Sequence, residues 1–232
     1  MRLFVIIVLI MPGIVFCGQK DPYAAKRDRM VDTQIIARGI SDSGTLQAMR
    51  KVPRHLFVPA LYASEAYSDR PLPIGYSQTI SQPFIVAYMT QLVRPSRGKT
   101  ALEIGTGSGY QAAVLAEIVD TVYSIEIIPE LARESAARLK VLGYRNIVTK
   151  YGDGYLGWPE HAPFDIIIVT AAADHIPQLL REQLAEGGRL VMPVGNPAFV
   201  QELVVLSKRN GRIREQRLEP VRFVPLRRLK EN

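Results

Sequence analysis

Three glycines spaced two residues apart mark the segment of the chain best suited to approach a small ligand. Gly105, Gly107 and Gly109 end an apolar run, and a helical pattern begins directly after them at Tyr110. Because glycine has no side chain, the backbone there can adopt positive φ angles and come close to a bound molecule. A dinucleotide-binding fingerprint has its third glycine five residues after the first, and that position is Tyr110 here. The spacing therefore disfavours a dehydrogenase.

Two acidic residues end the next two predicted strands. Glu126 ends the second strand, 21 residues after Gly105, where doubly wound nucleoside binders hold both ribose hydroxyls. Asp153 stands between two glycines at the end of the third strand, where a short acceptor can meet an adenine amino group. Taken alone, Glu126 could be a surface residue and Asp153 could belong to an ordinary Asp-Gly turn. Their joint occurrence at the carboxyl ends of neighbouring strands predicts a nucleoside-binding crevice.

The elements that position these residues alternate between strands and helices. Apolar strands are expected at residues 100–104, 121–127, 147–151, 164–170 and 189–194, with helices at 110–118 and 129–142 and a further helix that ends at Gly187 and Gly188. Residues 202–208 and 219–226 are expected to complete the sheet. Such alternation is typical of a mostly parallel sheet covered on both faces. The predicted fold class is therefore α/β, with a doubly wound, mostly parallel Rossmann-like sheet.

The residues before this sheet form a predicted N-terminal helical extension. Helices are expected at residues 30–39, just before Pro53 and at residues 83–93, with irregular backbone at 71–83 where prolines and a glycine disfavour regular structure. We expect one domain at residues 30–232, preceded by an apolar and basic segment at residues 1–29. The sequence has no coiled-coil pattern and no obvious apolar stripe, so we expect a monomer.

Composition and charge disfavour several other functions. With 47% hydrophobic residues a buried core is expected, and the single cysteine, Cys17, excludes an intramolecular disulfide. The three histidines are scattered, so no metal site is predicted. Residues 1–29 carry five basic and two acidic residues, and residues 208–232 carry nine and three, so the net charge of +7 lies at the two ends. We interpret these ends first as solvated tails and second as a docking surface, and we expect no nucleic-acid partner.

Residues 1–29 are compatible with three interpretations. Residues 3–16 form an apolar run like the core of a signal peptide, but the run is shorter than the roughly 20 residues of a membrane-spanning helix. Export, a weak anchor and a start codon at Met30 all fit this pattern. Four basic residues follow the run and favour a cytoplasmic location. We expect a cytoplasmic protein, with a periplasmic or membrane-anchored protein as the alternative and membrane contact only through residues 1–18.

One family of proteins carries similar segments along most of its length. Glu103 and the three glycines form an E-x-G-x-G-x-G pattern that resembles motif I of class I methyltransferases. The segments PIGYSQTISQP (73–83), LEIGTGSGYQAAVLA (102–116), GDG (152–154), APFDIIIVTAAA (162–173), EGGRLVMPVG (186–195) and VRFVPL (221–226) are similar to the signature segments of protein-L-isoaspartate O-methyltransferases. The resemblance covers residues 30–226. Motif I and GGRLV occur in many methyltransferases, whereas TISQP and RFVPL discriminate this family.

The resemblance implies a class I methyltransferase fold and an enzyme that transfers a methyl group from S-adenosyl-L-methionine to the α-carboxylate of L-isoaspartyl residues in damaged proteins and peptides. The ester then cyclises to a succinimide, which starts repair. Ser81 is implied as the active-site serine; without the resemblance it would be the N-cap of the helix that starts at Pro83. The implied cofactor-binding residues are Thr79, Ser81, Glu103, Gly105, Thr106, Gly107, Gly109, Glu126, Ile127, Asp153 and Gly154. The implied substrate-binding residues are Thr79, Ile80, Ser81, Val194, Gly195, Arg222 and Phe223.

The implied reaction needs no general base, because a carboxylate is already ionised at neutral pH. Orientation of the reactants, which supplies about 7 to 11 kcal/mol in well-aligned cases, is then expected to provide most of the catalysis. The alternative enzyme is another class I methyltransferase that acts on RNA or a small molecule, which only the basic C-terminal residues support. A binding module without catalysis is a weaker explanation, because Ser81 accompanies a complete cofactor crevice.

Overall fold

A seven-stranded sheet forms the centre of the molecule. The computed structural model describes residues 21–196 and 198–229. The strand order is β5-β4-β3-β6-β7-β8-β9. The first five of these strands are parallel to one another; β8 is antiparallel to β7, and β9 is antiparallel to β8. The strands are β3 (Thr100–Ile104), β4 (Thr121–Glu126), β5 (Ile147–Tyr151), β6 (Phe164–Val169), β7 (Leu184–Val194), β8 (Gln201–Arg209) and β9 (Arg212–Val221). The strand order reverses next to β3, so the predicted doubly wound sheet is confirmed.

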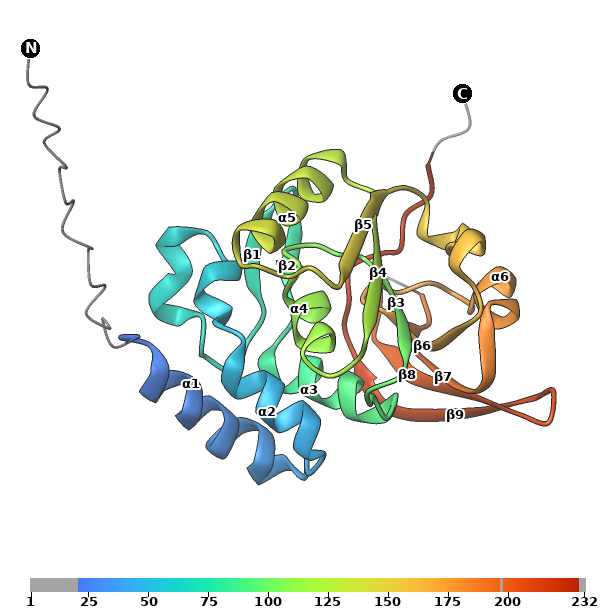
Figure 1. Cartoon of the computed structure of the whole chain (residues 1–232), viewed down its shortest axis with the longest axis horizontal. Coiled ribbons are helices and arrows are strands. Elements are labelled where there is room, and N and C mark those ends of the chain that lie inside the picture. Colours follow the sequence, from blue (N-terminus) through green and yellow to red (C-terminus); the bar gives the residue numbers. More distant parts are fainter. Residues whose placement is uncertain (1–20, 197, 230–232) are drawn as a thin grey trace, which may run out of the picture.

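Helices cover both faces of this sheet (Figure 1). They are α3 (Pro83–Leu92), α4 (Tyr110–Ala116), α5 (Pro129–Val141) and α6 (Gln178–Glu182). Along β6 the side chains alternate between faces: Ile166 and Ile168 pack in one core cluster with Leu115 of α4, whereas Ile167 packs in another with Leu180 of α6. A strand buried on both faces has no polar side, and this explains why the apolar runs in the sequence are continuous.

An N-terminal helical layer packs beyond α3 and α4. Helix α1 (Ala24–Met30) continues through a π-helical turn and a 3-10 turn to Gly39, whose φ of +88° ends it in the left-handed conformation. Helix α2 (Ser43–Lys51) follows, and its N-cap Asp42 accepts a hydrogen bond of 2.8 Å from the Thr45 N–H. Short 3-10 turns occupy Arg54–Phe57 and Ala60–Glu65. The predicted helical extension is therefore present, but its first helix begins at Ala24, before the expected start at residue 30.

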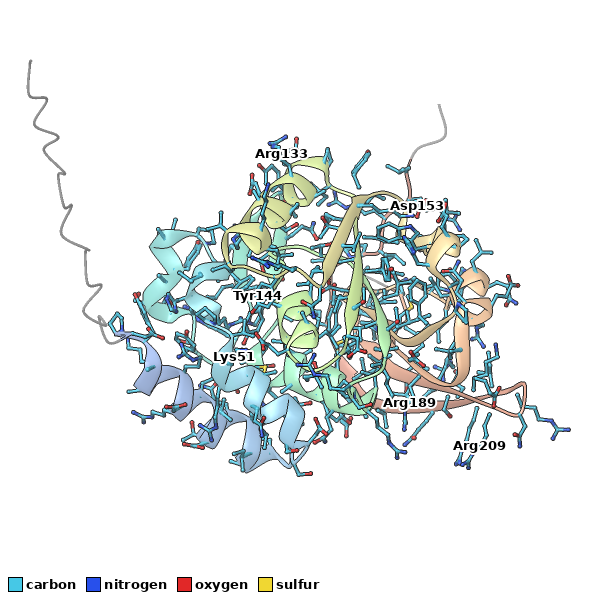
Figure 2. The ribbon with its side chains drawn as sticks, viewed as in Figure 1. Lys51, Arg133, Tyr144, Asp153, Arg189 and Arg209 are labelled. Carbon is cyan, nitrogen blue, oxygen red and sulfur yellow. The ribbon has the colours of Figure 1, made fainter. Side chains whose placement is uncertain are left out.

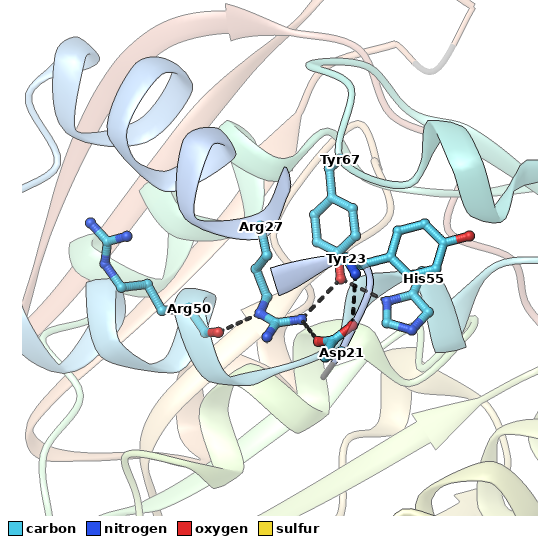
Figure 3. Close-up of polar contacts among 6 residues, drawn as sticks. All are labelled: Asp21, Tyr23, Arg27, Arg50, His55 and Tyr67. Atoms are coloured by element: carbon cyan, nitrogen blue, oxygen red, sulfur yellow. Dashed lines mark hydrogen bonds and ion pairs between the residues drawn. The ribbon is translucent and has the colours of Figure 1, made fainter. Parts of the chain in front are cut away.

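A polar cluster ties α1 to the rest of the fold (Figure 3). The Arg27 guanidinium donates hydrogen bonds to the Asp21 carboxylate at 2.7 Å, to the Tyr67 hydroxyl at 3.3 Å and to the backbone carbonyl of Arg50 in α2. The Tyr67 hydroxyl also lies 2.8 Å from Nδ1 of His55. Helix α1 thus crosses the expected boundary between residues 29 and 30 and makes polar contacts with the domain.

The expected signal-like or anchoring segment at residues 3–16 lies outside the described residues. In the described part of the chain, none of the helices combines the length and apolar character needed to cross a bilayer.

The backbone at residues 71–83 is more regular than expected. Strands β1 (Leu72–Gly75) and β2 (Gln78–Ile80) form a two-stranded antiparallel hairpin. The expectation of irregular backbone was wrong because a two-stranded pair leaves one edge of each strand without a partner, and proline is tolerated on such edges. Tyr76 and Ser77 form the turn with φ values of +52° and +58°. This hairpin places Ser81 directly before α3.

The predicted helix that ends at Gly187 and Gly188 is also wrong. Helix α6 ends at Glu182, and the two glycines lie inside β7. Pairing between β6 and β7 shifts register there, because Leu184 pairs with Phe164 and Arg189 pairs with Ile166. Glycines in a strand often mark such a bulge.

The last strand lies earlier than the expected residues 219–226. Strand β9 ends at Val221, and the chain then leaves the sheet and runs past the carboxyl end of β6. Ala172 holds it there, because its N–H donates to the Val224 carbonyl at 2.8 Å and its carbonyl accepts from the Leu226 N–H at 2.7 Å. The basic residues between 208 and 221 therefore lie on paired strands, so the interpretation of this part as a solvated tail was wrong.

Candidate active site

A cleft opens where the strand order reverses, at the carboxyl ends of β3, β4 and β6. Predicted residues Thr79, Gly105, Gly107, Glu126, Ile127 and Gly154 line it, together with Gln78, Ile104, Ile125, Ile128, Thr170, Ala171 and residues 224–227. Ligands bind at this place in open α/β sheets. The sequence analysis missed Thr170, although the rule that located Glu126, a polar residue at the carboxyl end of a strand, also applies to it.

The loop after β3 is held tightly between the neighbouring strands. Gly105 has a φ of +94°, and a Cβ atom there would lie 2.5 Å from the Thr170 hydroxyl oxygen, so only glycine fits. That hydroxyl donates a hydrogen bond of 2.7 Å to the Gly105 carbonyl. On the other side, the Gly105 N–H donates to the Ile125 carbonyl at 2.8 Å. The loop backbone is therefore rigid where it faces the cleft.

Glu126 is fixed by two backbone donors. One carboxylate oxygen accepts a hydrogen bond from the Gly107 N–H at 2.7 Å, and the other accepts from the Ile128 N–H at 2.9 Å. The side chain is only 5% exposed, and that part faces the cleft. Each carboxylate oxygen has two acceptor sites, so both can still accept a hydroxyl. This arrangement fits the predicted contact with a ribose.

Glu103 and Thr106 lie beneath the cleft instead of lining it. The Glu103 side chain is fully buried, and Ser124 donates a hydrogen bond to it. Burial raises the pKa of the Glu103 carboxyl to about 8; the Ser124 hydrogen bond opposes this, and the charge of Glu126 adds to it. The Thr106 hydroxyl lies 2.6 Å from the Ser124 hydroxyl. Both residues therefore support the loop from below.

Gly109 and Asp153 also have supporting positions. A Cβ atom on Gly109 would lie 3.2 Å from the Leu139 side chain of α5, so this glycine permits helix packing. The Asp153 carboxylate accepts hydrogen bonds from the Tyr155 N–H at 2.8 Å and the Leu229 N–H at 3.3 Å. Of the predicted Asp153–Gly154 pair, only Gly154 lines the cleft.

The residue types of the cleft fit a nucleoside cofactor, but its enclosed volume is small. The cleft encloses about 60 Å³, and Gln78 and residues 224–227 are part of its lining. Small-molecule sites usually enclose about 300 to 1,000 Å³. The polar groups for a ribose and a close backbone approach are in place, so a nucleoside bound there extends beyond the enclosed part of the cleft.

A larger groove lies next to the cleft. It has a volume of about 800 Å³, and its lining includes the predicted residues Thr79, Ser81, Arg222 and Phe223, together with Arg38, Pro71, Gln82, Phe84, Ile85, Tyr88, Glu219, Pro220 and Val221. Thr79, Thr170 and Val224 line both the groove and the cleft. The two cavities therefore share one wall.

Ser81 lies on the groove side of this shared wall. The N-cap of α3 is Gln82, which makes no side-chain capping bond, so the alternative role of Ser81 as the N-cap was wrong. Among the described residues, the Ser81 hydroxyl has no hydrogen-bond partner within the protein. Arg222 likewise forms no ion pair within the described part of the chain. A hydroxyl and a guanidinium are thus available to a carboxylate in the groove.

Three predicted substrate residues lie outside the groove. Ile80 is 4% exposed and packs in the core beneath the hairpin. Val194 is the last residue of β7, and Gly195 follows it and donates from its N–H to the Ala173 carbonyl at 2.8 Å. Neither of these two residues lines the cleft or the groove.

Gln201 is a buried residue near the groove that the sequence analysis missed. Its side-chain carbonyl accepts a hydrogen bond from the Phe223 N–H at 2.8 Å, and its amide donates to the Phe199 carbonyl at 2.6 Å. It therefore links the loop after β7 to the groove wall. Its partners are backbone groups, one of them 22 residues away, so the sequence offers no signal for this role.

Comparison with known proteins identifies the family to which this site belongs. The family model described as protein-L-isoaspartate(D-aspartate) O-methyltransferase matches residues 25–231. The chain belongs to this family. The match includes most of α1 as well as the strand-end cleft and the groove.

Individual members of the protein-L-isoaspartate O-methyltransferase family are similar over most of their length. The Opitutus terrae enzyme is 54% identical over 99% of this chain and 98% of its own. The Gloeobacter violaceus enzyme is 58% identical over 87% of this chain and 98% of its own. A solved Plasmodium falciparum structure, described as a protein of this kind in complex with S-adenosyl-L-homocysteine, superposes with a TM-score of 0.74 at 27% identity and covers 87% of this chain and 98% of its own.

These similarities confirm the predicted family, the class I methyltransferase fold, the isoaspartyl methyltransferase function and the S-adenosylmethionine cofactor.

Proposed function

We propose that methyl transfer takes place at the wall shared by the cleft and the groove, with the cofactor in the cleft and an isoaspartyl peptide in the groove. The observation that carries this proposal is that Thr79, Thr170 and Val224 line both cavities. Two reactants can meet in line only where their sites adjoin. The cleft and the groove meet this requirement because they share a wall, and Ser81 lies on the groove side of that wall.

The residues of the cleft hold and orient the cofactor. Glu126 accepts the ribose hydroxyls, and the backbone at Gly105, Gly107 and Gly154 allows close approach. When bound, S-adenosylmethionine supplies an electrophilic methyl group. Glu103, Thr106, Gly109 and Asp153 keep the loops in place from outside the cleft.

The residues of the groove hold the nucleophile. The Ser81 hydroxyl donates a hydrogen bond to one oxygen of the α-carboxylate, which leaves the other oxygen directed at the shared wall. Arg222 balances the negative charge of the substrate before transfer. No group has to remove a proton, because the carboxylate is ionised at neutral pH. Catalysis then depends on orientation and on exclusion of water from the carboxylate.

Recognition of an isoaspartyl residue requires the enzyme to measure the main chain of its substrate. Isoaspartyl and aspartyl linkages differ by one methylene in the backbone, and the flanking side chains can be of any type. The groove lies between the hairpin and the segment after β9, both of which run as extended chain beside it. An extended peptide can bind such edges through backbone hydrogen bonds.

Replacement of Ser81 tests its role. Ser81→Ala removes a hydrogen bond to a charged group, worth about 1.5 to 3 kcal/mol, so kcat should fall by roughly ten- to a hundredfold. The KM for S-adenosylmethionine should stay within about twofold, because Glu126 and the glycine loop are untouched. Ser96→Ala, in an exposed loop, is the matched control. Steady-state kinetics with an isoaspartyl peptide measure both constants, and an unchanged kcat in Ser81→Ala would remove Ser81 from the mechanism.

The remaining expectations are proposals about the setting of the enzyme. We propose a monomer that acts in the cytoplasm, where its cofactor is made. We also propose that the domain extends to the N-terminal side of the expected boundary between residues 29 and 30; the family match from residue 25 and the hydrogen bond of Arg27 to α2 support this. The cytoplasmic proposal would be contradicted if a periplasmic fraction contained the mature chain, cleaved after residue 17 or 18 and otherwise intact.

A further inference from the structure

Besides the cleft and the groove that Ser81 lines, which we call the peptide groove, the protein has another concave surface. It lies at the opposite end of the sheet from the cleft. We call it the basic groove. Its volume is about 460 Å³. Its lining consists of Arg94, Lys99, Gly187, Arg189, Val205, Ser207, Lys208, Arg209, Arg214 and Gln216. Six of these residues are cationic, and none is acidic.

The register of the sheet explains why the cations gather there. Arg189 of β7 pairs with Ser207 of β8, which pairs with Arg214 of β9, so these three side chains form a row across one face. In the next row Arg209 pairs directly with Arg212. Like charges placed opposite each other on a sheet are destabilising. The floor of the basic groove therefore concentrates positive charge at a cost to the folded protein.

The segment between α3 and β3 adds two more cations above this floor. The Lys99 ammonium donates a hydrogen bond of 2.6 Å to the Arg94 carbonyl. Lys208 follows Ser207 on β8, so its side chain lies on the opposite face, where its ammonium donates a hydrogen bond of 2.8 Å to the Leu184 carbonyl. A carbonyl positions an ammonium group without cancelling its charge. The Lys99 ammonium has three donors, so two of them remain for a ligand in the groove.

Arg189 has an unsatisfied donor. Its Nε atom is buried and has no hydrogen-bond partner among the described residues. Burial lowers the pKa of the Arg189 guanidinium from its ordinary value, and the charge of Arg94 lowers it further. A buried donor without a partner is costly. Arg189 also lines the groove, so an acceptor there can pair with the other N–H groups of the guanidinium.

The nearby carboxylates are engaged elsewhere. Asp165 accepts a hydrogen bond from the Thr100 N–H at 2.8 Å, and Glu186 accepts from the Gly211 N–H at 3.1 Å. Glu215 pairs with Arg181 and Arg217. Across residues 21–196 and 198–229, no ion pair involves any of the six cations of the basic groove.

We propose that the basic groove binds a small, multiply charged phosphate anion of the triphosphate class. Guanidinium groups match phosphate oxygens in geometry and charge, and the volume of about 460 Å³ lies in the range of small-molecule sites. Figure 2 shows Arg189 and Arg209 near one edge of the molecule and Asp153 near the opposite edge. The basic groove is thus a site separate from the cofactor cleft.

Calorimetric titration of the full chain with inorganic tripolyphosphate tests this proposal. We expect saturable binding with one site, weakened by salt because the ligand and the groove are both charged. The double variant Arg189→Gln, Arg214→Gln should bind at least about tenfold more weakly, because it loses two hydrogen-bonding partners of a charged ligand. The control Arg133→Gln, Arg145→Gln changes the net charge equally at exposed positions away from the groove and should bind as the unmodified protein does.

Both double variants should retain methyl transfer to an isoaspartyl peptide, since none of the four residues lines the cleft or the peptide groove. Arg214 lies on an exposed edge strand, so Arg214→Gln alone supplies a folded variant if the double variant fails to fold. The proposal is overturned by an absence of saturable binding at low salt, or by equal weakening in the control. It is also overturned if a single-stranded RNA displaces tripolyphosphate and binds more tightly, which would assign the groove to nucleic acid.

Discussion

At the scale of single residues, Glu103 and Glu126 show how position on a strand determines function. Both lie near the carboxyl ends of neighbouring strands, yet only Glu126 reaches the cleft. Glu103 points into the sheet, where one carboxyl oxygen has no hydrogen-bond partner among the described residues. A protonated carboxyl is the less costly form at such a site. Glu103 is therefore a structural residue, and the protonation of its carboxyl makes the stability of the folded protein depend on pH.

The pH dependence of stability should reveal the buried Glu103 carboxyl. Its pKa rises from 4.5 to about 8 in the folded protein. Between these values the folded state holds a proton that the unfolded state has released, so stability is greatest below the lower value and declines as pH rises through the higher one. Glu103→Gln lacks this decline. As pH rises between the two pKa values, the free energy of unfolding of the variant should therefore increase relative to that of the unmodified protein, by up to about 1.4 kcal/mol per pH unit.

Urea unfolding at several values between pH 5 and pH 8 measures this difference. Glu160→Gln, at an exposed position, is the control and should follow the unmodified protein. Parallel curves for Glu103→Gln and the unmodified protein would show that Glu103 is ionised when folded.

Much of the candidate site could be predicted from the sequence, and the exceptions share a physical cause. Glycine spacing and strand-end position located Gly105, Gly107 and Glu126, while Ser81 came only from the resemblance to a family. Spacing identifies a loop, but it does not say which side chains face the ligand and which face the core. Glu103 and Thr106 were therefore placed in the cofactor site, although they support it from beneath.

At the scale of elements, the segment after β9 matters most for the site. Residues 222–226 leave the sheet and form walls of both cavities. The apolar residues Val221, Phe223 and Val224 favour a strand, which is why the sequence predicts one there. The observed path depends on bonds to Ala172 and Gln201, which are distant in the chain. Local pattern located the central strands well because their burial is continuous, but it does not contain such distant contacts.

Loss of the Gln201 side chain should disturb the peptide groove more than the cofactor cleft. Gln201→Leu leaves the partly buried Phe223 N–H without its acceptor, at a cost of about 1 kcal/mol. We expect the KM for an isoaspartyl peptide to rise by about three- to tenfold, and by more than the KM for S-adenosylmethionine. Gln178→Leu, on the exposed face of α6, is the matched control. Unchanged KM values in a destabilised Gln201→Leu protein would limit Gln201 to a structural role.

At the scale of the whole molecule, the two ends of the sheet have different characters. The carboxyl end holds the cleft and the peptide groove, whereas the other end holds the basic groove. The net charge of +7 suggested two charged tails, but much of the C-terminal share lies on β8 and β9. Arg27 in α1 is likewise bonded within the fold. Basic residues near the two ends of the sequence thus lie partly in folded helices and strands.

The central claim is that the enzyme methylates isoaspartyl residues by holding their carboxylate at the shared wall. The most direct test is transfer of labelled methyl from S-adenosylmethionine by the full chain to two peptides of equal sequence, one with an isoaspartyl and one with an aspartyl linkage. We expect label in the isoaspartyl peptide alone, released by mild base as methyl esters are. Equal labelling of both peptides, or of neither while the cofactor still binds, would contradict the account.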